Sequence, residues 1–405
     1  MMKHRLIPLF ATAALVVVRP LAAEEQPRQV QIGELTVVPL SGLAPRNEHI
    51  DLHAKALLGA RADSRLLTGS DDSGDVSLRG IAGLDGNYRP DENTSTHATA
   101  VIEGRRYFEH RELDGLGGAA AVDYRERGLV TSIGANASWM RTDDLLLDTG
   151  ERLVSDTYRA GAELERRQIF SHYIIAGEAS RHDYLDGGAL FGADDSDRYR
   201  VAVDLHLAWD YASEAFIFSH TRVEDLLYDH HTIYDDSVGL SQSLGWDRTL
   251  GERSSFSVEA GVVARRFMGR GAADPDTRLA PFGLLTVNWS WEEGSRLRGR
   301  VFSDLQDTAT RSATWVYGTM WDARYRLAIA TSLLAEGGVQ QWRDSEAPSG
   351  GTREVRTVTI AKIGIEHQLR AGWAFGIFAG YLDSTAEIGS YYHDFTAVGE
   401  VGFVY

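Results

Sequence analysis

The chain has 405 residues, no cysteine, 41 glycines, 9 prolines and a formal net charge of -17. The lack of cysteine excludes disulfides and thiolate metal sites, and the acidic balance argues against nucleic acid as a partner. This length suits two or three ordinary domains or one large all-β domain.

The first residues have the features of an export signal. A basic segment, residues 3–5, precedes an apolar run over residues 6–18, and small residues end at Ala23 before two glutamates. The apolar run is shorter than the about 20 residues that a membrane-spanning helix needs, and its flanks fit a cleaved signal peptide. We therefore predict a signal peptide over residues 1–23.

Residues 24–49 lack any regular hydrophobic pattern and contain Pro27, Pro39 and Pro45. We interpret them as a periplasmic N-terminal lead with room for one short strand at residues 30–38. The segment is too short for a plug domain.

From residue 50 to residue 405 the hydrophobic pattern has a period of two, as in β-strands. Residues 199–211 show this best. The apolar face of this segment consists of Tyr199, Val201, Val203, Leu205, Leu207, Trp209 and Tyr211. The opposite face consists of Arg198, Arg200, Ala202, Asp204, His206, Ala208 and Asp210. A transmembrane strand needs about 9–11 residues with an apolar outside, a polar lumen and aromatic girdles, and this segment fits that description.

Similar segments recur along the chain and predict about eighteen antiparallel strands, within a range of about sixteen to twenty. Residues 213–224 and 331–343 cannot be assigned a face from their pattern. The predicted strand centres lie near residues 56, 82, 102, 121, 136, 161, 176, 204, 218, 242, 260, 286, 300, 320, 337, 361, 377 and 399. Short and long connections tend to alternate, as periplasmic turns and outer loops do. The predicted long loops are residues 141–156, 183–197, 224–237, 267–280, 343–353 and 382–393. The fold class is therefore a transmembrane antiparallel β-barrel in the cell outer membrane.

The final strand ends on an aromatic residue. Val401, Phe403 and Tyr405 lie on its apolar face, and a last strand of this kind resembles the signal that the barrel-assembly machinery recognises in outer-membrane barrels. We expect that machinery, outer-membrane lipid and lipopolysaccharide among the partners.

The predicted lumen face carries charges of both signs. A basic row on one strand is followed by two arginines on the next, and further charges point inward elsewhere. The pore candidates are Arg296, Arg298, Arg300, Arg324, Arg326, Arg198, Arg200, Asp204, Lys362 and Glu366. Such residues can set selectivity for ionic or polyhydroxylic solutes. Alternatively, Glu292, Asp304 and Asp322 neutralise the arginines, which would then form a wall of paired charges.

The sequence offers no convincing metal, cofactor or catalytic site. Acidic loop clusters do not match the spacing of an EF-hand, and adjacent histidines such as His230 and His231 point to opposite faces of a strand. No local signature places a nucleophile, a base and an orienting group together. We therefore predict that the chain is not an enzyme and binds no cofactor.

The strand architecture and the turn at residues 245–254 (Gly-Trp-Asp-Arg-Thr-Leu-Gly-Glu-Arg-Ser) resemble the β-barrel porins encoded beside exopolysaccharide polymerisation and export genes. The resemblance spans roughly residues 30–405. Residues 57–65 (Leu-Leu-Gly-Ala-Arg-Ala-Asp-Ser-Arg) depart from the aromatic and acidic motif of the first strand in that family. The resemblance implies a conduit for exopolysaccharide that works with periplasmic polysaccharide-export proteins.

Two other functions stay open at this point. One is a general or solute-selective porin for small polar molecules, and the other is a structural or enzymatic barrel without transport.

Overall fold

The computed structural model describes most of the chain. The described residues are 30–32, 35–37, 49–64, 74–111, 114–146, 151–187, 197–212, 214–229, 236–251, 253–268, 277–292, 294–308, 311–344, 355–369, 372–386 and 392–404. The predicted signal peptide, residues 1–23, lies outside these ranges and stays a prediction. The described part of the chain contains no helix long and apolar enough to cross a membrane.

Two short strands, β1 (Val30–Ile32) and β2 (Leu35–Val37), precede a closed barrel. The barrel strands are β3 (Ile50–Asp63), β4 (Asp75–Tyr88), β5 (Thr94–Tyr107), β6 (Gly115–Arg127), β7 (Thr131–Leu146), β8 (Glu151–Arg167), β9 (Ser171–Gly187), β10 (Arg198–Ala212), β11 (Ala215–Tyr228), β12 (Ser237–Leu250), β13 (Ser254–Phe267), β14 (Thr277–Glu292), β15 (Ser295–Thr308), β16 (Arg311–Ala328), β17 (Thr331–Asp344), β18 (Val355–Gln368), β19 (Trp373–Ala386) and β20 (Tyr392–Val404).

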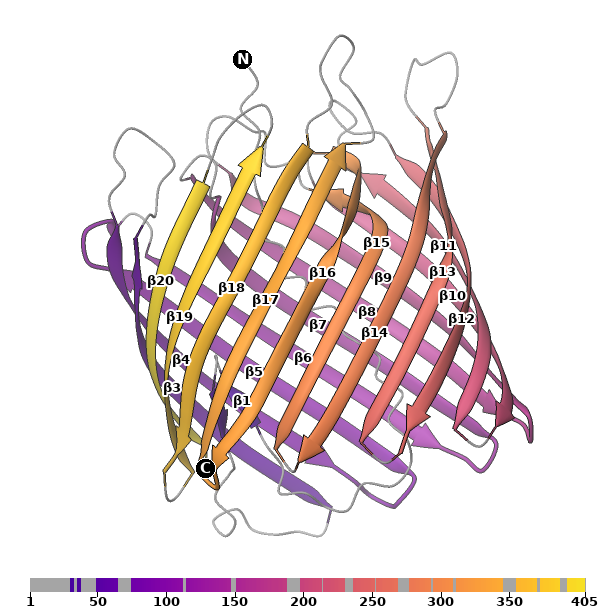
Figure 1. Cartoon of the computed structure of the whole chain (residues 1–405), viewed down its shortest axis with the longest axis horizontal. Helices are drawn as coiled ribbons and strands as arrows, with labels where there is room; N and C mark the ends of the chain where they lie inside the picture. The colour runs from indigo at the N-terminus through magenta and orange to yellow at the C-terminus, as the bar shows by residue number, and fades with distance from the viewer. Residues whose placement is uncertain are drawn as a thin grey trace.

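Each barrel strand pairs antiparallel with its neighbours in the chain, and β20 pairs with β3 to close the sheet (Figure 1). The eighteen barrel strands confirm the predicted fold class. Every predicted strand centre falls within a different one of these strands. Closure removes the exposed strand edges that an open sheet would present to lipid, where no water can satisfy backbone groups.

The two ends of the barrel differ in their connections. At the end where β3 begins and β20 finishes, three tight turns contain Gly251, Gly294 and Gly372 with φ of 70°, 82° and 76°. Glycine adopts this left-handed region without the steric penalty of a Cβ atom. Short turns mark the periplasmic side of such barrels.

The prediction of a long loop over residues 141–156 is wrong. β7 and β8 stay paired up to Leu146 and Glu151, so the hairpin extends beyond its neighbours. Backbone pairing continues there in polar sequence, where no contact with lipid requires an apolar residue at every second position. The sequence pattern alone therefore predicts a loop.

Alternation gives the wall an apolar outer face with aromatic girdles. Outward side chains remain largely exposed in the isolated chain, for example Leu58 at 66% and Ile377 at 61%. Near the periplasmic end, Trp291 stacks on Tyr325 and Trp373 contacts Phe403 at a ring distance of 4.7 Å. Trp and Tyr are enriched at both interfaces of transmembrane barrels.

β1 and β2 form an antiparallel hairpin where one short strand was predicted. β2 lies alongside β18, β19 and β20, and β1 lies alongside β3. In Figure 1 the hairpin is drawn behind the front wall, within the outline of the barrel. The hairpin therefore lies inside the barrel, beside the strands where the sheet closes.

Candidate functional site

The lumen face is the polar face of the strands, opposite the exposed apolar residues. Arg79 of β4 pairs with Glu400 of β20, although β3 lies between them. Leu58 and Leu78, on the opposite face of β3 and β4, are 66% and 42% exposed. The face of Arg79 and Glu400 is therefore the lumen, and the opposite face carries the exposed apolar residues.

Three of these contacts share one design, which we call a glycine saddle. A lumen-facing glycine on the middle strand leaves room for an arginine and a glutamate on the two flanking strands to meet above it. The saddles are Arg79–Gly59–Glu400, Arg125–Gly134–Glu163 and Arg265–Gly239–Glu224. A Cβ atom on the glycine would lie 2.7–3.0 Å from the glutamate Cγ at each position. Glycine in a strand often marks such a close approach.

The saddle at Gly239 is the centre of a larger ion-pair network on β10–β13. Glu224 accepts a hydrogen bond from Arg265 and another from Arg200 at 2.6 Å, and Arg222 lies 3.5 Å away. Arg265 is 2% exposed. The one buried carboxylate of Glu224 thus interacts with three guanidinium groups.

Next to this network, His220 bridges two acids. Its ring nitrogens lie 3.0 Å from Asp204 and 3.2 Å from Glu259, and Asp204 also accepts from Arg222 at 2.9 Å. The predicted pore residues Arg200 and Asp204 therefore belong to a connected set of paired charges. Arg198 lies on the same face of β10, directly opposite His182 in register.

A second group of predicted residues, on β15 and β16, is arranged differently. Arg296 and Arg324 lie directly opposite each other, and Arg298 opposes Asp322. Arg296 Nε is 4.0 Å from Asp322 Oδ2, while Arg324 donates to Glu366 Oε1 at 2.8 Å across β17. Arg326 follows Arg324 on the same face of β16.

Arg298 and Arg300 make no ion pair with any carboxylate among the described residues. Arg300 instead lies near the Met320 sulfur at 3.5 Å and over the Phe302 ring at 5.1 Å. Three acids were predicted to neutralise this row, and of the two whose side chains are described, only Asp322 lies within ion-pair reach of an arginine in it. Asp304 accepts the backbone N–H of Leu305, and the Glu292 side chain lies outside the described residues.

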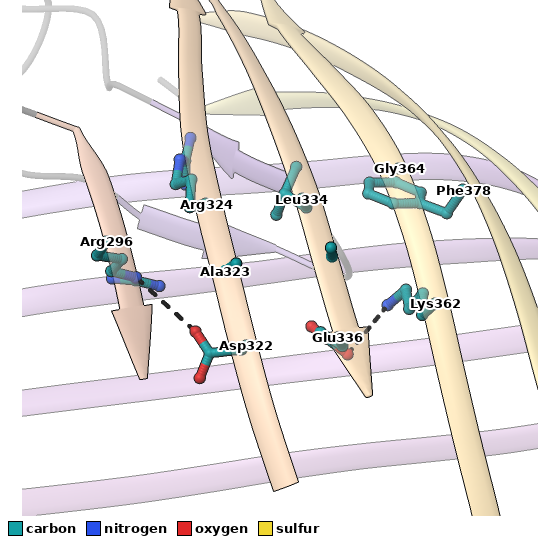
Figure 2. Close-up of a pocket in the computed structure, with 10 residues that line it drawn as sticks. Arg296, Asp322, Ala323, Arg324, Leu334, Glu336, Lys362, Gly364 and Phe378 are labelled. Atoms are coloured by element: carbon teal, nitrogen blue, oxygen red, sulfur yellow. Dashed lines mark ion pairs between the residues drawn. The ribbon is translucent and has the colours of Figure 1, made fainter. Parts of the chain in front are cut away.

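The arginine row borders a recess in the wall of about 560 Å³ of empty space, including its solvent-filled mouth. Figure 2 shows Arg296 and Arg324 at one side and Lys362 with Phe378 at the other. Lys362 Nζ lies 4.0 Å from Glu336 and 5.3 Å from the centre of the Phe378 ring. The Phe378 ring lies flat over Gly364, where a Cβ atom would be only 2.1 Å from it. The recess thus combines three cationic side chains and two carboxylates, Asp322 and Glu336, with an apolar floor.

A feature that the sequence analysis missed is an apolar patch on the lumen face beside the β1–β2 hairpin. Leu57, Ile81, Ala374, Phe378 and Val404 are 0–7% exposed and pack together. Their positions on the polar face of the alternation could have indicated the patch, since each replaces an expected polar residue.

The predicted terminal strand is present as β20. Val401 and Phe403 face outward and pair in register with Phe375 and Trp373. Tyr405 lies outside the described residues. His230 and His231 also lie outside them, and no group of three or more potential ligands among the described residues could hold a metal ion.

No protein-family model matches the chain, and no curated protein matches its sequence. Solved structures do resemble it. OccK2 (OpdF) of Pseudomonas aeruginosa is 10% identical with a TM-score of 0.51, over 88% of this chain and 98% of that chain. OccAB4 of Acinetobacter baumannii is 9% identical with a TM-score of 0.50, over 89% and 100%. A BenF-like porin from Pseudomonas fluorescens is 10% identical with a TM-score of 0.48, over 88% and 99%.

The chain therefore has the fold of outer-membrane porins. At these identities the likeness concerns the fold alone. The association with exopolysaccharide export, which the sequence resemblance implied, finds no support in these comparisons.

Proposed function

We propose that this protein is a solute-selective outer-membrane porin that favours small anionic solutes. The observation that carries the proposal is the arginine row on β15 and β16. Arg298 and Arg300 face the lumen without a carboxylate partner among the described residues, and Arg296 and Arg324 flank them. Barrels of sixteen to eighteen strands leave an aqueous channel, and unpaired charges on its wall set ion selectivity.

The chemistry of the row suits carboxylates and other oxyanions. A guanidinium group presents a planar fork of donors that matches such groups in a bidentate manner. The row lies near the recess lined by Lys362 and Phe378, which offers apolar contact as well as charge. Small amphipathic anions would satisfy both features, whereas a neutral solute would use only the second.

Reconstitution in planar bilayers tests this proposal. The reversal potential in a KCl gradient should show anion selectivity for the unmodified chain, and the double variant Arg298→Gln/Arg300→Gln should shift it toward cations. The matched control is Arg106→Gln/Arg248→Gln, because Arg106 of β5 and Arg248 of β12 are exposed on the outer face, in register with Leu78 and Phe256. Selectivity should also weaken in 1 M salt, where the Debye length falls to about 3 Å. Equal selectivity of the lumen variant and the control would refute the role of the row.

A second measurement separates small-solute transport from polymer export. Vesicles containing the protein should take up a small dicarboxylate faster than a neutral solute of similar size. Deletion of the gene should leave surface polysaccharide staining unchanged. Loss of surface polysaccharide together with equal uptake of both solutes would favour the export conduit instead.

A further inference from the structure

The outer face of β15–β17 carries a cluster that the transport proposal does not use. Arg343 lies over the rings of Trp315 and Tyr317, with its guanidinium carbon 5.8 Å and 5.4 Å from the two centres. The two rings contact each other at 4.8 Å. Trp315 Nε1 donates to Ser303 Oγ at 2.9 Å, which holds the indole against the neighbouring strand.

The cluster lies at the outer membrane interface. Tyr325 belongs to the periplasmic aromatic girdle of the same strand, and the spacing from Tyr325 up to Tyr317 and Trp315 matches the about 9–11 residues that cross the membrane. Arg343 is the last residue but one of β17, at the outer end of the strand. A second outward pair, Arg181 over Tyr199 at 4.6 Å, lies at the same end of the barrel.

The two outward arginines differ in their partners. Arg181 pairs with Asp183 at 2.5 Å and with Asp229 at 3.6 Å, so its charge is compensated. Arg343 is exposed and pairs with no carboxylate among the described residues. Its charge remains available to a ligand at the level of the lipid headgroups.

We propose that Arg343, Trp315 and Tyr317 form a binding site for a phosphate group of a glycolipid in the outer leaflet. Guanidinium groups bind phosphate through two parallel hydrogen bonds. The rings underneath fix the guanidinium in place and provide the amphipathic surface that suits a headgroup boundary.

The wall below the cluster explains why the ligand is a lipid and not free phosphate. Thr319 lies one outward position below Tyr317, and its register partners Val301 and Val339 are 50% and 42% exposed on the same face. Acyl chains attached to the phosphorylated sugar can cover this apolar strip. Free phosphate would make only the contact with Arg343.

The test uses the purified full chain in detergent, with diphosphoryl lipid A and its dephosphorylated form as probes. The unmodified protein should bind the diphosphoryl form at least about tenfold more tightly, since two charge-assisted hydrogen bonds distinguish the two forms. Arg343→Gln should remove that preference, and Arg343→Lys should restore part of it. Arg248→Gln is the matched control, because Arg248 is an exposed outward arginine at the periplasmic end of β12.

Heat-modifiable gel mobility confirms that each variant is folded before binding is measured. Inorganic phosphate at millimolar concentration should compete weakly. The proposal is overturned if Arg343→Gln binds like the control, or if inorganic phosphate displaces the lipid as well as excess lipid A does. It is also overturned if both lipid A forms bind equally to the unmodified protein.

Discussion

The lumen walls formed by β10–β13 and by β15–β16 are both rich in arginine, yet they differ in how far these arginines are paired with carboxylates. On the first wall, Glu224 serves Arg200, Arg222 and Arg265. On the second wall, Arg296 faces Arg324 directly, and Arg298 and Arg300 have no carboxylate partner among the described residues. The difference lies in where the acids stand, because Glu224 is within reach of Arg200 on the neighbouring strand and of Arg265 across Gly239, whereas the residue opposite Arg296 is another arginine. Arginine content alone therefore does not distinguish a structural wall from a selective one.

Removing the carboxylate of Glu224 should cause the largest loss in the free energy of unfolding. Glu224→Ala would remove the carboxylate that accepts from Arg265, whose side chain is 2% exposed. Loss of one member of a buried ion pair costs about 3–5 kcal/mol. Urea unfolding of the refolded barrel in lipid vesicles should show a loss of that size. A loss below about 1 kcal/mol would mean that the network is not a stabilising element of this wall.

A charge introduced on the lipid-facing side of β10 should cause the second-largest loss in the free energy of unfolding. Leu205→Arg places a cation at mid-membrane on β10, at a cost of about 2–4 kcal/mol. Asp204→Asn, one residue away but in the lumen, should cost less because the amide oxygen can still accept from Arg222. Urea unfolding of the two variants compares them, and equal costs would show that the assignment of the faces of β10 is wrong.

This assignment of faces could be made from the sequence because lipid requires one apolar side chain in every two. The same requirement predicted the number of strands and the lumen positions of Arg200, Asp204, Arg298 and Lys362. It says nothing about which charges meet, since pairing depends on register and on contacts across a third strand. The saddle at Gly239 and the Arg324–Glu366 pair were therefore invisible in the pattern, as was the continued pairing of β7 with β8.

The same substitution in an exposed saddle should have a smaller effect. Glu163→Ala removes the partner of Arg125, but the two side chains are 26% and 46% exposed. Exposed ion pairs contribute about 0–1 kcal/mol because water and salt screen them. Unfolding midpoints of Glu163→Ala and Glu224→Ala, measured together, compare the two saddles directly. Similar losses would show that the saddle geometry, and not burial, determines the stability.

Arg296→Gln should have the smallest effect on the free energy of unfolding, and this effect should be a gain. It therefore distinguishes the two walls most clearly. Arg296 lies directly opposite Arg324, and like charges at such positions destabilise a sheet by an amount on the order of 0.2–1 kcal/mol. The only described acid near it, Asp322, is 4.0 Å away, with both side chains at least 40% exposed, so their pairing contributes little. Arg296→Gln should therefore raise the free energy of unfolding slightly while it weakens anion selectivity.

Unfolding in urea and the reversal potential in a KCl gradient, both measured on this variant, check the prediction. A gain in stability with a loss of selectivity would show that the repulsion between Arg296 and Arg324 destabilises the second wall but supports anion selectivity. If the variant instead loses stability by about 1 kcal/mol or more, Arg296 is held by a partner after all. The second wall would then be a paired wall like the first.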